Sequence, residues 1–197
     1  MKRTLWLGAI LLTTAQPALA SNTLIVAQAP VAVAKSPMTV TPDREWNKMG
    51  ARPGRNSESW TIDGDGLNEV TFYGGIEADR TLFREVSKRT MPLPRFSATM
   101  LLTDIPALFE ASYRIALNTP VMKIDTVAPT TFLGHKAVQF AFTYSRVDEE
   151  VRRRGDAVAA IIGGKLFMIT FDAPDIFYYQ RDVAAYRAIV ATAAIAR

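Results

Sequence analysis

The sequence predicts an α+β domain in which hairpin-connected strands form a sheet and helices pack against it. Three observations support this fold class. Residues 138–145 alternate large apolar side chains with smaller or polar ones, which is the period of a strand. Residues 157–162 and 166–171 flank a Gly163-Gly164-Lys165 turn, and the second segment is apolar on both faces. Residues 175–194 repeat apolar side chains at steps of three and four, as a helix does.

The first twenty residues have the pattern of an export signal. Lys2 and Arg3 precede the apolar run 5–12, and Ala18-Leu19-Ala20 is a small-x-small cleavage site. The run is far shorter than the roughly 20 residues that a membrane-spanning helix needs. We therefore expect cleavage after Ala20 and a periplasmic protein with no stable membrane span. A signal that stays uncleaved, and so holds the chain at the membrane, is the alternative.

Residues 21–41 are expected to form a flexible tether rich in Ala, Pro and Val. Pro30 and Pro37 fit neither a long helix nor a central strand. A first strand over 23–27 is the alternative, because Leu24, Ile25 and Val26 favour β structure. The globular domain then spans residues 42–197.

Hairpins are predicted next, with strands over 45–49, 59–62 and 69–76. The Asp63-Gly64-Asp65-Gly66 segment supplies the positive φ angles of a tight turn. A calcium loop would need an oxygen ligand at its fifth position, where Leu67 stands. A turn is therefore favoured over a metal site.

A long surface connection is expected over 77–96, followed by a helix that starts at Thr103 or Asp104. Either residue can cap a helix, and proline is tolerated in the first turn. The stripe that covers the sheet is Ile105, Leu108, Phe109, Ser112 and Ile115.

Composition excludes several classes of function. Without the leader, 21 Lys and Arg face 19 Asp and Glu, a net charge of +2 that is too weak to predict nucleic-acid binding. The chain has no cysteine, which rules out disulfides, thiolate catalysis and a lipid-modified N-terminal cysteine. His135 is the one histidine, too few for a transition-metal site, and no Gly-x-Ser-x-Gly pattern supplies the nucleophile that a catalytic triad also needs. We predict no cofactor, no metal and no catalytic residue.

Over roughly Trp46 to Ile195, the chain resembles the small exported bacterial proteins with the PsbP-like fold, including the DcrB-type envelope proteins. The resemblance rests on Arg154-Gly155-Asp156-Ala157, Gly163-Gly164-Lys165-Leu166, Phe171-Asp172-Ala173-Pro174, Tyr178-Tyr179 and the terminal amphipathic helix. It implies an antiparallel sheet of about six strands with helices on both faces, an α/β/α sandwich. It also implies a non-enzymatic accessory or binding role in the envelope. The missing cysteine departs from the lipid anchor of DcrB-type proteins and favours a free periplasmic protein.

Four residues are candidates for ligand binding. Arg152 and Arg154 share one face of an extended segment and could contact an anion or an acidic partner, although a solvated, cross-strand paired edge is the favoured interpretation. Tyr178 and Tyr179 open the last helix, and adjacent helical positions point about 100° apart, so one of them is expected to face outward or into a cleft. The candidate partners are an envelope protein or a small ligand.

The sequence thus predicts an exported, non-enzymatic binding or accessory protein. The alternative is an envelope hydrolase that uses carboxylates such as Asp63, Asp65 or Asp172, because two acids alone can run glycoside chemistry. Such an enzyme needs two carboxyl groups about 5 to 10 Å apart in a cleft. A converging acid pair with a raised pKa would favour it.

Overall fold

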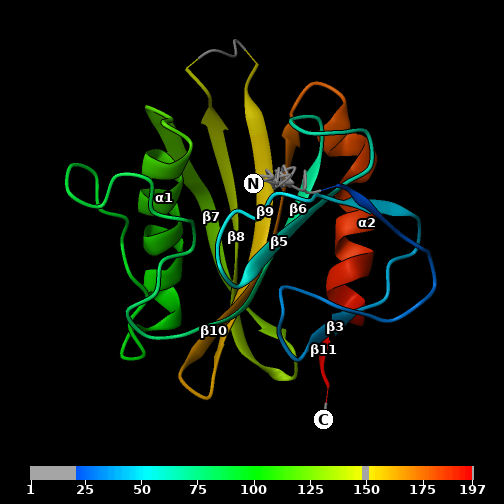
Figure 1. Ribbon diagram of the computed structural model, residues 1–197, viewed down its shortest axis with the longest axis horizontal. Coiled ribbons are helices and arrows are strands. Elements are labelled where there is room, and N and C mark those ends of the chain that lie inside the picture. The colour runs from blue at the N-terminus through cyan, green and yellow to red at the C-terminus, as the bar shows by residue number, and fades with distance from the viewer. Residues whose placement is uncertain (1–20, 148–150, 197) are drawn as a thin grey trace, which may run out of the picture.

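The chain folds around one large antiparallel sheet that carries a helix on each face (Figure 1). The computed structural model describes residues 21–147 and 151–196. Eight strands lie in the order β1-β4-β5-β6-β10-β9-β8-β7. The strands are β1 Thr23–Ile25, β4 Trp46–Lys48, β5 Ser57–Thr61, β6 Glu69–Ile76, β7 Val121–Phe132, β8 His135–Ser145, β9 Arg153–Ile162 and β10 Lys165–Pro174. The predicted α+β class is confirmed, and the sheet has more strands than the six expected.

The two helices pack on opposite faces of the sheet. Helix α1, Ile105–Ala116, follows the short 3-10 helix η1, Leu102–Asp104, and lies at the left in Figure 1. Helix α2, Tyr178–Thr192, lies at the right. Successive side chains along the central strands point to opposite faces of the sheet, so each face has its own hydrophobic core. Helix α1 packs on one of these cores and helix α2 on the other. The helices therefore form the two outer layers that the sequence predicts.

Helix α1 starts directly after Asp104, as the sequence predicts. The Oδ2 of Asp104 accepts a hydrogen bond from the backbone N–H of Leu101 at 2.8 Å, which closes the turn that leads into the helix. Proline stands in the first turn, where its missing N–H costs no helical hydrogen bond. The buried face of α1 consists of Ile105, Pro106, Leu108, Phe109, Ser112 and Tyr113, with Ile115 half-buried beside them.

The two predicted glycine turns are present. Gly163 and Gly164 have φ angles of 56° and 73° and join β9 to β10. Gly64 and Gly66, at 125° and 79°, lie in the turn between β5 and β6. Both turns use a backbone conformation that residues with a Cβ rarely adopt. The strands that these turns connect are the hairpins expected from the sequence.

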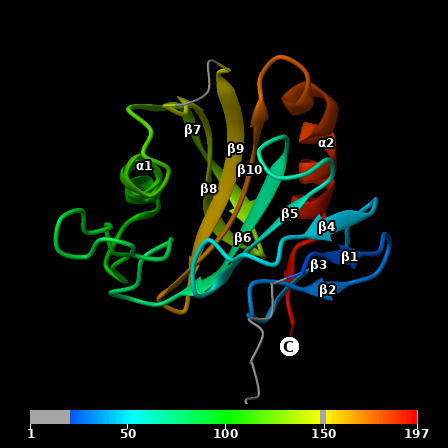
Figure 2. The same cartoon turned by 45° about the horizontal axis from the view of Figure 1, so that its top comes forward.

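Residues 21–41 are not a free tether. They contain β1 and two strands of a small sheet, β2 Val31–Ala32 and β3 Met38–Val40, which is completed by β11, Ala194–Ile195 (Figure 2). Val33 and Met38 are fully buried in the α2-side core. The apolar side chains of this segment therefore pack on the domain, and its prolines fall between the short strands. The expected leader, residues 1–20, lies outside the described residues.

The connection from β6 to α1 has no helix or strand between Ile76 and Leu102. It is nevertheless anchored, because Leu82, Phe83, Leu93 and Phe96 are buried in the α1-side core. The predicted surface loop is thus a layer that covers part of the sheet next to α1 (Figure 2). Among the described residues, no helix combines the length and apolar character needed to cross a membrane.

Candidate functional site

A mainly apolar pocket of about 490 Å³ lies on the α1 side of the sheet. Its floor comes from β6, β8 and β10, and its walls come from α1 and from the 77–101 loop. We call it the α1 pocket. Its lining residues are Pro53, Glu69, Thr71, Phe83, Arg84, Val86, Ser87, Met91, Leu93, Tyr113, Ile115, Ala116, Leu117, Tyr144, Arg146 and Asp172.

Two carboxyl groups meet in the floor of the α1 pocket. Glu69 of β6 is the cross-strand partner of Asp172 of β10. Directly opposed residues of antiparallel strands have Cβ atoms about 4.5 to 5.5 Å apart and point to the same face. The sheet register therefore places the two acids side by side, which the linear sequence does not reveal.

Asp172 is neutralised by a buried cation. Its Oδ2 accepts hydrogen bonds from Arg153 Nη2 at 2.9 Å, from Arg153 Nε at 3.1 Å and from the Tyr144 hydroxyl at 2.7 Å. The side chains of Arg153 and Asp172 are 1% and 5% exposed. Burial alone would lower the pKa of Arg153, but Asp172 and Tyr144 more than offset this and raise it. The pair is therefore a fixed, charged part of the floor.

Glu69 has no such cation among the described residues. Thr71 donates a hydrogen bond to its Oε1 at 3.1 Å, and Ser59 is a second hydroxyl partner. Burial, followed by the charge of Asp172, raises the pKa of Glu69, and the two hydroxyls offset only part of that shift. Glu69 is therefore a carboxyl group whose negative charge is poorly compensated, in the floor of a pocket.

Two buried hydroxyl groups that lack a hydrogen-bond partner in the described structure lie on the same face of the sheet as this acid. The hydroxyls of Tyr73 and Thr170 are buried and have no hydrogen-bond partner among the described residues. Both lie on the α1-side face, two positions along their strands from Thr71 and Asp172. Burial raises the pKa of Tyr73 well above its usual range, so it stays a hydrogen-bond donor at neutral pH. Buried polar groups are normally paired, so these two hydroxyls are exceptions, but neither residue lines the α1 pocket.

Much of the exposed lining of the pocket is apolar, although exposed Arg84 and half-buried Ser87 and Arg146 also line it. Val86 and Met91 of the 77–101 loop are 94% and 56% exposed, and half-buried Ile115 and Leu117 face them from the end of α1. Phe83 supports this rim through an edge contact with Tyr113, with ring centroids 5.3 Å apart. An apolar rim above a polar floor is the usual arrangement of a small-molecule site.

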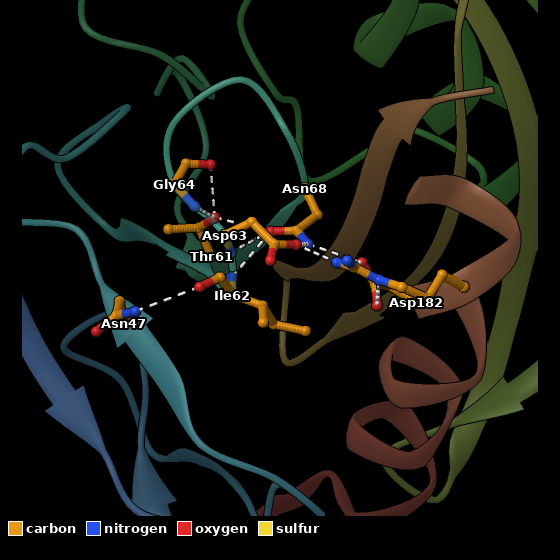
Figure 3. Close-up of polar contacts among 8 residues, drawn as sticks. Asn47, Thr61, Ile62, Asp63, Gly64, Asn68 and Asp182 are labelled. Atoms are coloured by element: carbon orange, nitrogen blue, oxygen red, sulfur yellow. Dashed lines mark hydrogen bonds and ion pairs between the residues drawn. The ribbon is translucent and has the colours of Figure 1, made fainter. Parts of the chain in front are cut away.

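The turn between β5 and β6 fixes one end of the floor (Figure 3). Asn68 is fully buried, and its Oδ1 accepts hydrogen bonds from Thr61 Oγ1 and from the backbone N–H groups of Ile62 and Asp63. Its Nδ2 donates to Asp63 and to Asp182 of α2, both at 2.7 Å. The turn is thereby joined to α2, and its Gly66 carbonyl accepts a hydrogen bond from Arg153.

The structure places the sequence-predicted tyrosines and arginines outside the α1 pocket. Tyr179 is buried, stacks on Phe171 and donates a hydrogen bond to Asp156 at 2.9 Å. Burial, then Asp156, raises the pKa of Tyr179 to about 12. The Arg154 guanidinium lies 4.6 Å from the ring centroid of Tyr179. Arg154 and Tyr179 thus lie against each other, and Tyr179 is also held by Asp156 and Phe171.

The other two candidates are less enclosed. Tyr178 is half-buried, with the Arg181 guanidinium 5.0 Å from its ring centroid. Arg152 is exposed and lines a small hollow of about 290 Å³ that Arg154 also lines. Asp125 and Asp175 line the same hollow, so acids face these arginines there. Residues 148–150, which precede these arginines, lie outside the described residues.

The acids named as hydrolase candidates separate into two groups. Asp63 and Asp65 are exposed, and Asp63 forms an ion pair with Arg181, while Asp172 is buried in the pocket floor. His135 is exposed at the start of β8. Among the described residues, no group of three His, Cys, Asp or Glu side chains is placed to hold a metal ion.

Sequence reasoning missed Glu69, Arg153 and Tyr144 as site residues. Arg153 had a readable signal, because it shares its strand face with Gly155 and Ala157, which are buried and small. A charged residue in phase with core residues indicates a buried ion pair. Glu69 had no such signal, because its importance comes from the register between β6 and β10.

Comparison with known proteins identifies the fold. No protein-family model matches the chain, and no curated protein matches its sequence. Among solved structures, the solution structure of cyanobacterial PsbP (CyanoP) from Synechocystis sp. PCC 6803 matches with a TM-score of 0.54 and 14% identity, over 90% of this chain and 94% of that one. LpqN, involved in cell envelope biogenesis of Mycobacterium tuberculosis, matches with a TM-score of 0.38 and 12% identity, over 90% and 86%. The likeness to CyanoP shows that the chain has the predicted PsbP-like fold.

Proposed function

We propose that this chain is a non-enzymatic binding protein whose α1 pocket holds a small amphipathic ligand. The ligand presents a cationic or hydrogen-bond-donating group to Glu69 and lays its apolar part against the rim. The observation that carries this proposal is Glu69 itself, an acid in the pocket floor that forms no ion pair with any described residue. A ligand ammonium group would supply the missing positive charge.

The composition of the pocket supports this ligand chemistry. Asp172 is already paired with Arg153, so the floor carries one compensated and one uncompensated carboxyl group. Charge-assisted hydrogen bonds to a carboxylate are roughly twice as strong as neutral ones. The exposed Val86 and Met91 offer apolar surface that a ligand would cover. A cationic head with an apolar tail therefore matches both parts of the pocket.

Three probes that differ only in their head group test this proposal. Octylammonium, octanol and octanoate are titrated into the purified protein at neutral pH, and binding is followed by calorimetry and by shifts of backbone amide resonances. We expect octylammonium to bind most tightly and octanoate most weakly. The Glu69→Gln variant should lose about tenfold or more of its octylammonium affinity, since a charged hydrogen bond contributes about 1.5 to 3 kcal/mol.

Glu45→Gln is the matched control, because Glu45 is exposed and lies outside the pocket. It should bind all three probes as the unchanged protein does. Equal affinity for octylammonium and octanoate would contradict the proposal, and so would an unchanged octylammonium affinity in Glu69→Gln.

A carboxylate-dependent hydrolase is the second candidate function, and the Glu69–Asp172 pair is the observation that favours it. The two acids converge in a pocket, and the pKa of Glu69 is raised, as a general acid requires. Against it, Arg153 and Tyr144 occupy Asp172 and weaken it as a nucleophile or base. Hydrolysis of a panel of aryl glycosides that is lost in both Glu69→Gln and Asp172→Asn would establish the enzyme.

We also propose that the protein acts in the periplasm after removal of residues 1–20. The basic start, the apolar run and the Ala18-Leu19-Ala20 site support export. A DcrB-type accessory role, with an envelope protein as partner, is compatible with the PsbP-like fold, and Tyr178, Tyr179, Arg152 and Arg154 remain candidate contact residues for such a partner. N-terminal sequencing of the protein from the periplasmic fraction should read Ser21 first. Full-length chain in the membrane fraction would favour the uncleaved signal.

A further inference from the structure

A second hollow, of about 600 Å³, is lined by five basic and two acidic residues and lies next to the α1 pocket. Three separate segments bring these cations together: the turn at 33–36, the loop at 50–56 and the start of the 77–101 loop. We call it the basic groove. Its lining residues are Lys35, Arg52, Gly54, Arg55, Asn56, Ile76, Glu77, Arg80, Thr81, Phe83, Arg84 and Glu85.

The two acids of the basic groove are already paired with cations from outside it. Glu77 forms an ion pair with Lys165, with Oε1 and Nζ 3.0 Å apart. Glu85 forms one with Arg95, with Oε2 and Nη2 3.1 Å apart. The hydrogen bond and charge of Lys165 lower the pKa of Glu77, so this acid is ionised and satisfied. Arg80 and Arg55 lower the pKa of Glu77 further, so this acid offsets part of their charge, although its ion pair is with Lys165.

Most of those basic residues keep their charge available. Within residues 21–147 and 151–196, none of Lys35, Arg55, Arg80 and Arg84 forms an ion pair, and all four are exposed. Arg52 is bound to Glu58 through Nη2 at 3.4 Å, but its Nη1 is buried without a hydrogen-bond acceptor in the described structure. Like charges gathered in a hollow focus a positive potential there.

Close backbone packing holds the arginine-bearing segments in place. The backbone N–H of Arg84 donates to the carbonyl of Pro53 at 2.7 Å. A Cβ atom on Gly54 would collide with the carbonyl oxygen of Leu82, so the two loops can approach this closely only because residue 54 is glycine. The positions of Arg55 and Arg80 are therefore fixed relative to each other by the fold.

The turn that carries Lys35 is fixed as well. Ala34 and Lys35 adopt φ angles of 55° and 52°, an uncommon conformation for residues with a Cβ. Ser36 holds the turn by donating to the Val33 carbonyl at 2.8 Å, and it packs directly on Gly74 of β6. The turn thus brings Lys35 to the groove at the cost of local backbone strain.

We propose that the basic groove binds a phosphate-bearing ligand. Arginine guanidinium groups match the oxygens of a phosphate in paired hydrogen bonds, and several fixed arginines favour more than one phosphate or a phosphate on a larger group. The ligand's source is either a soluble polyphosphate compound or an anionic lipid headgroup, which share this chemistry. This site does not depend on Glu69, although Phe83 and Arg84 line both hollows.

The test uses both sources and a variant that leaves the α1 pocket intact. Sodium tripolyphosphate is titrated by calorimetry, and vesicles of phosphatidylcholine with and without phosphatidylglycerol are tested by flotation. Arg55→Gln with Arg80→Gln removes two charges that line only the basic groove. We expect this double variant to bind the preferred probe at least about tenfold more weakly, as the loss of one or more charged hydrogen bonds requires.

Arg89→Gln with Lys136→Gln is the matched control, because it removes the same charge from exposed positions outside the groove. Its affinity should stay within about twofold of the unchanged protein, because only a distant, screened charge effect remains.

In the unchanged protein, tripolyphosphate should shift the backbone amide resonances of residues 52–56 and 80–84. Binding of tripolyphosphate, or of phosphatidylglycerol vesicles alone, identifies the source. Failure of both probes to bind, equal losses in the two double variants, or resonance shifts confined to other segments would overturn the proposal.

Discussion

Glu69 of β6 and Asp172 of β10 are cross-strand partners, yet among the described residues Arg153 forms an ion pair with Asp172 and not with Glu69. The same sheet register thus creates both a stable ion pair and a poorly compensated acid. The ion pair belongs to the framework of the pocket floor, and the second acid is available to a ligand. This asymmetry is the basis of the proposed binding site.

Replacing Glu69 should change how stability depends on pH. Burial and Asp172 raise its pKa in the folded state, so Glu69 stabilises the fold fully only below its unfolded pKa of about 4.3. This contribution is lost as pH rises through the raised folded pKa. Glu69→Gln, which is neutral at every pH, should therefore become more stable than the unchanged protein as pH rises from acid to neutral. Urea unfolding at several pH values measures this difference.

The exposed-site variant Glu45→Gln is the control for that comparison. Its stability relative to the unchanged protein should depend little on pH. If the difference between Glu69→Gln and the unchanged protein is the same at pH 4 and pH 8, Glu69 carries no unfavourable charge in the folded state.

The buried pair of Arg153 and Asp172 should show strong coupling. Removing one partner of a buried ion pair costs about 3 to 5 kcal/mol, because the other charge is left uncompensated. We expect Arg153→Met to be destabilised by this amount in urea unfolding. The double variant Arg153→Met with Asp172→Leu should be less destabilised than the sum of the two single variants. Additive effects would show that the two side chains do not stabilise each other.

Asn68 should be essential to the turn between β5 and β6. Its side chain bridges three donors of the turn and two acids, and it is fully buried (Figure 3). Asn68→Ala leaves these groups unpaired and should cost at least about 1 to 3 kcal/mol in thermal or urea unfolding. Asn47→Ala, which removes one long hydrogen bond of 3.5 Å to the Ile62 carbonyl, should cost clearly less. Equal costs would contradict this role of Asn68.

Gly155 should tolerate no side chain. A Cβ atom there would collide with the Phe142 ring and lie 2.6 Å from the Phe171 carbonyl oxygen. Overpacking of this kind typically costs about 1 to 3 kcal/mol. Gly155→Ala should therefore unfold at clearly lower urea concentration. A midpoint unchanged by the substitution would mean that the ring moves aside freely.

Several strands and helices were predictable because their apolar residues recur at the regular spacing of a strand or a helix. The β6 strand was predicted over 69–76 and is found there, and the alternation of Val138 to Tyr144 reflects one face packed on α1. The hairpin at Gly163-Gly164 and helix α2 follow from turn chemistry and helical spacing. These features depend on local sequence, which a single chain displays directly.

Other parts of the fold could not be predicted from local pattern. Strand β7 is an edge strand whose side chains are mostly exposed, so it lacks a clear alternation of apolar and polar residues. The 21–41 segment looked like a tether because its strands are only two or three residues long, although Val33 and Met38 are buried. In both cases pairing with distant strands, rather than local propensity, determines the structure.

The candidate site was less predictable than the fold. Arg152 and Arg154 drew attention as part of a charged run, but Arg153 between them is the buried member, because strand parity points it to the α1 face. Glu69 is separated from Asp172 by more than a hundred residues, and only the β6–β10 register joins them. A site assembled by sheet register leaves no motif in one segment.

The titration of the Glu69 side-chain carboxyl carbon by NMR, with and without octylammonium, is the most direct test of the binding site. A bound ammonium group favours the ionised carboxylate. The account predicts that the free protein titrates above the usual range of a glutamic acid and that octylammonium lowers this midpoint. A Glu69 midpoint in the usual range, or one that saturating octylammonium leaves unchanged, would contradict the proposed role of Glu69.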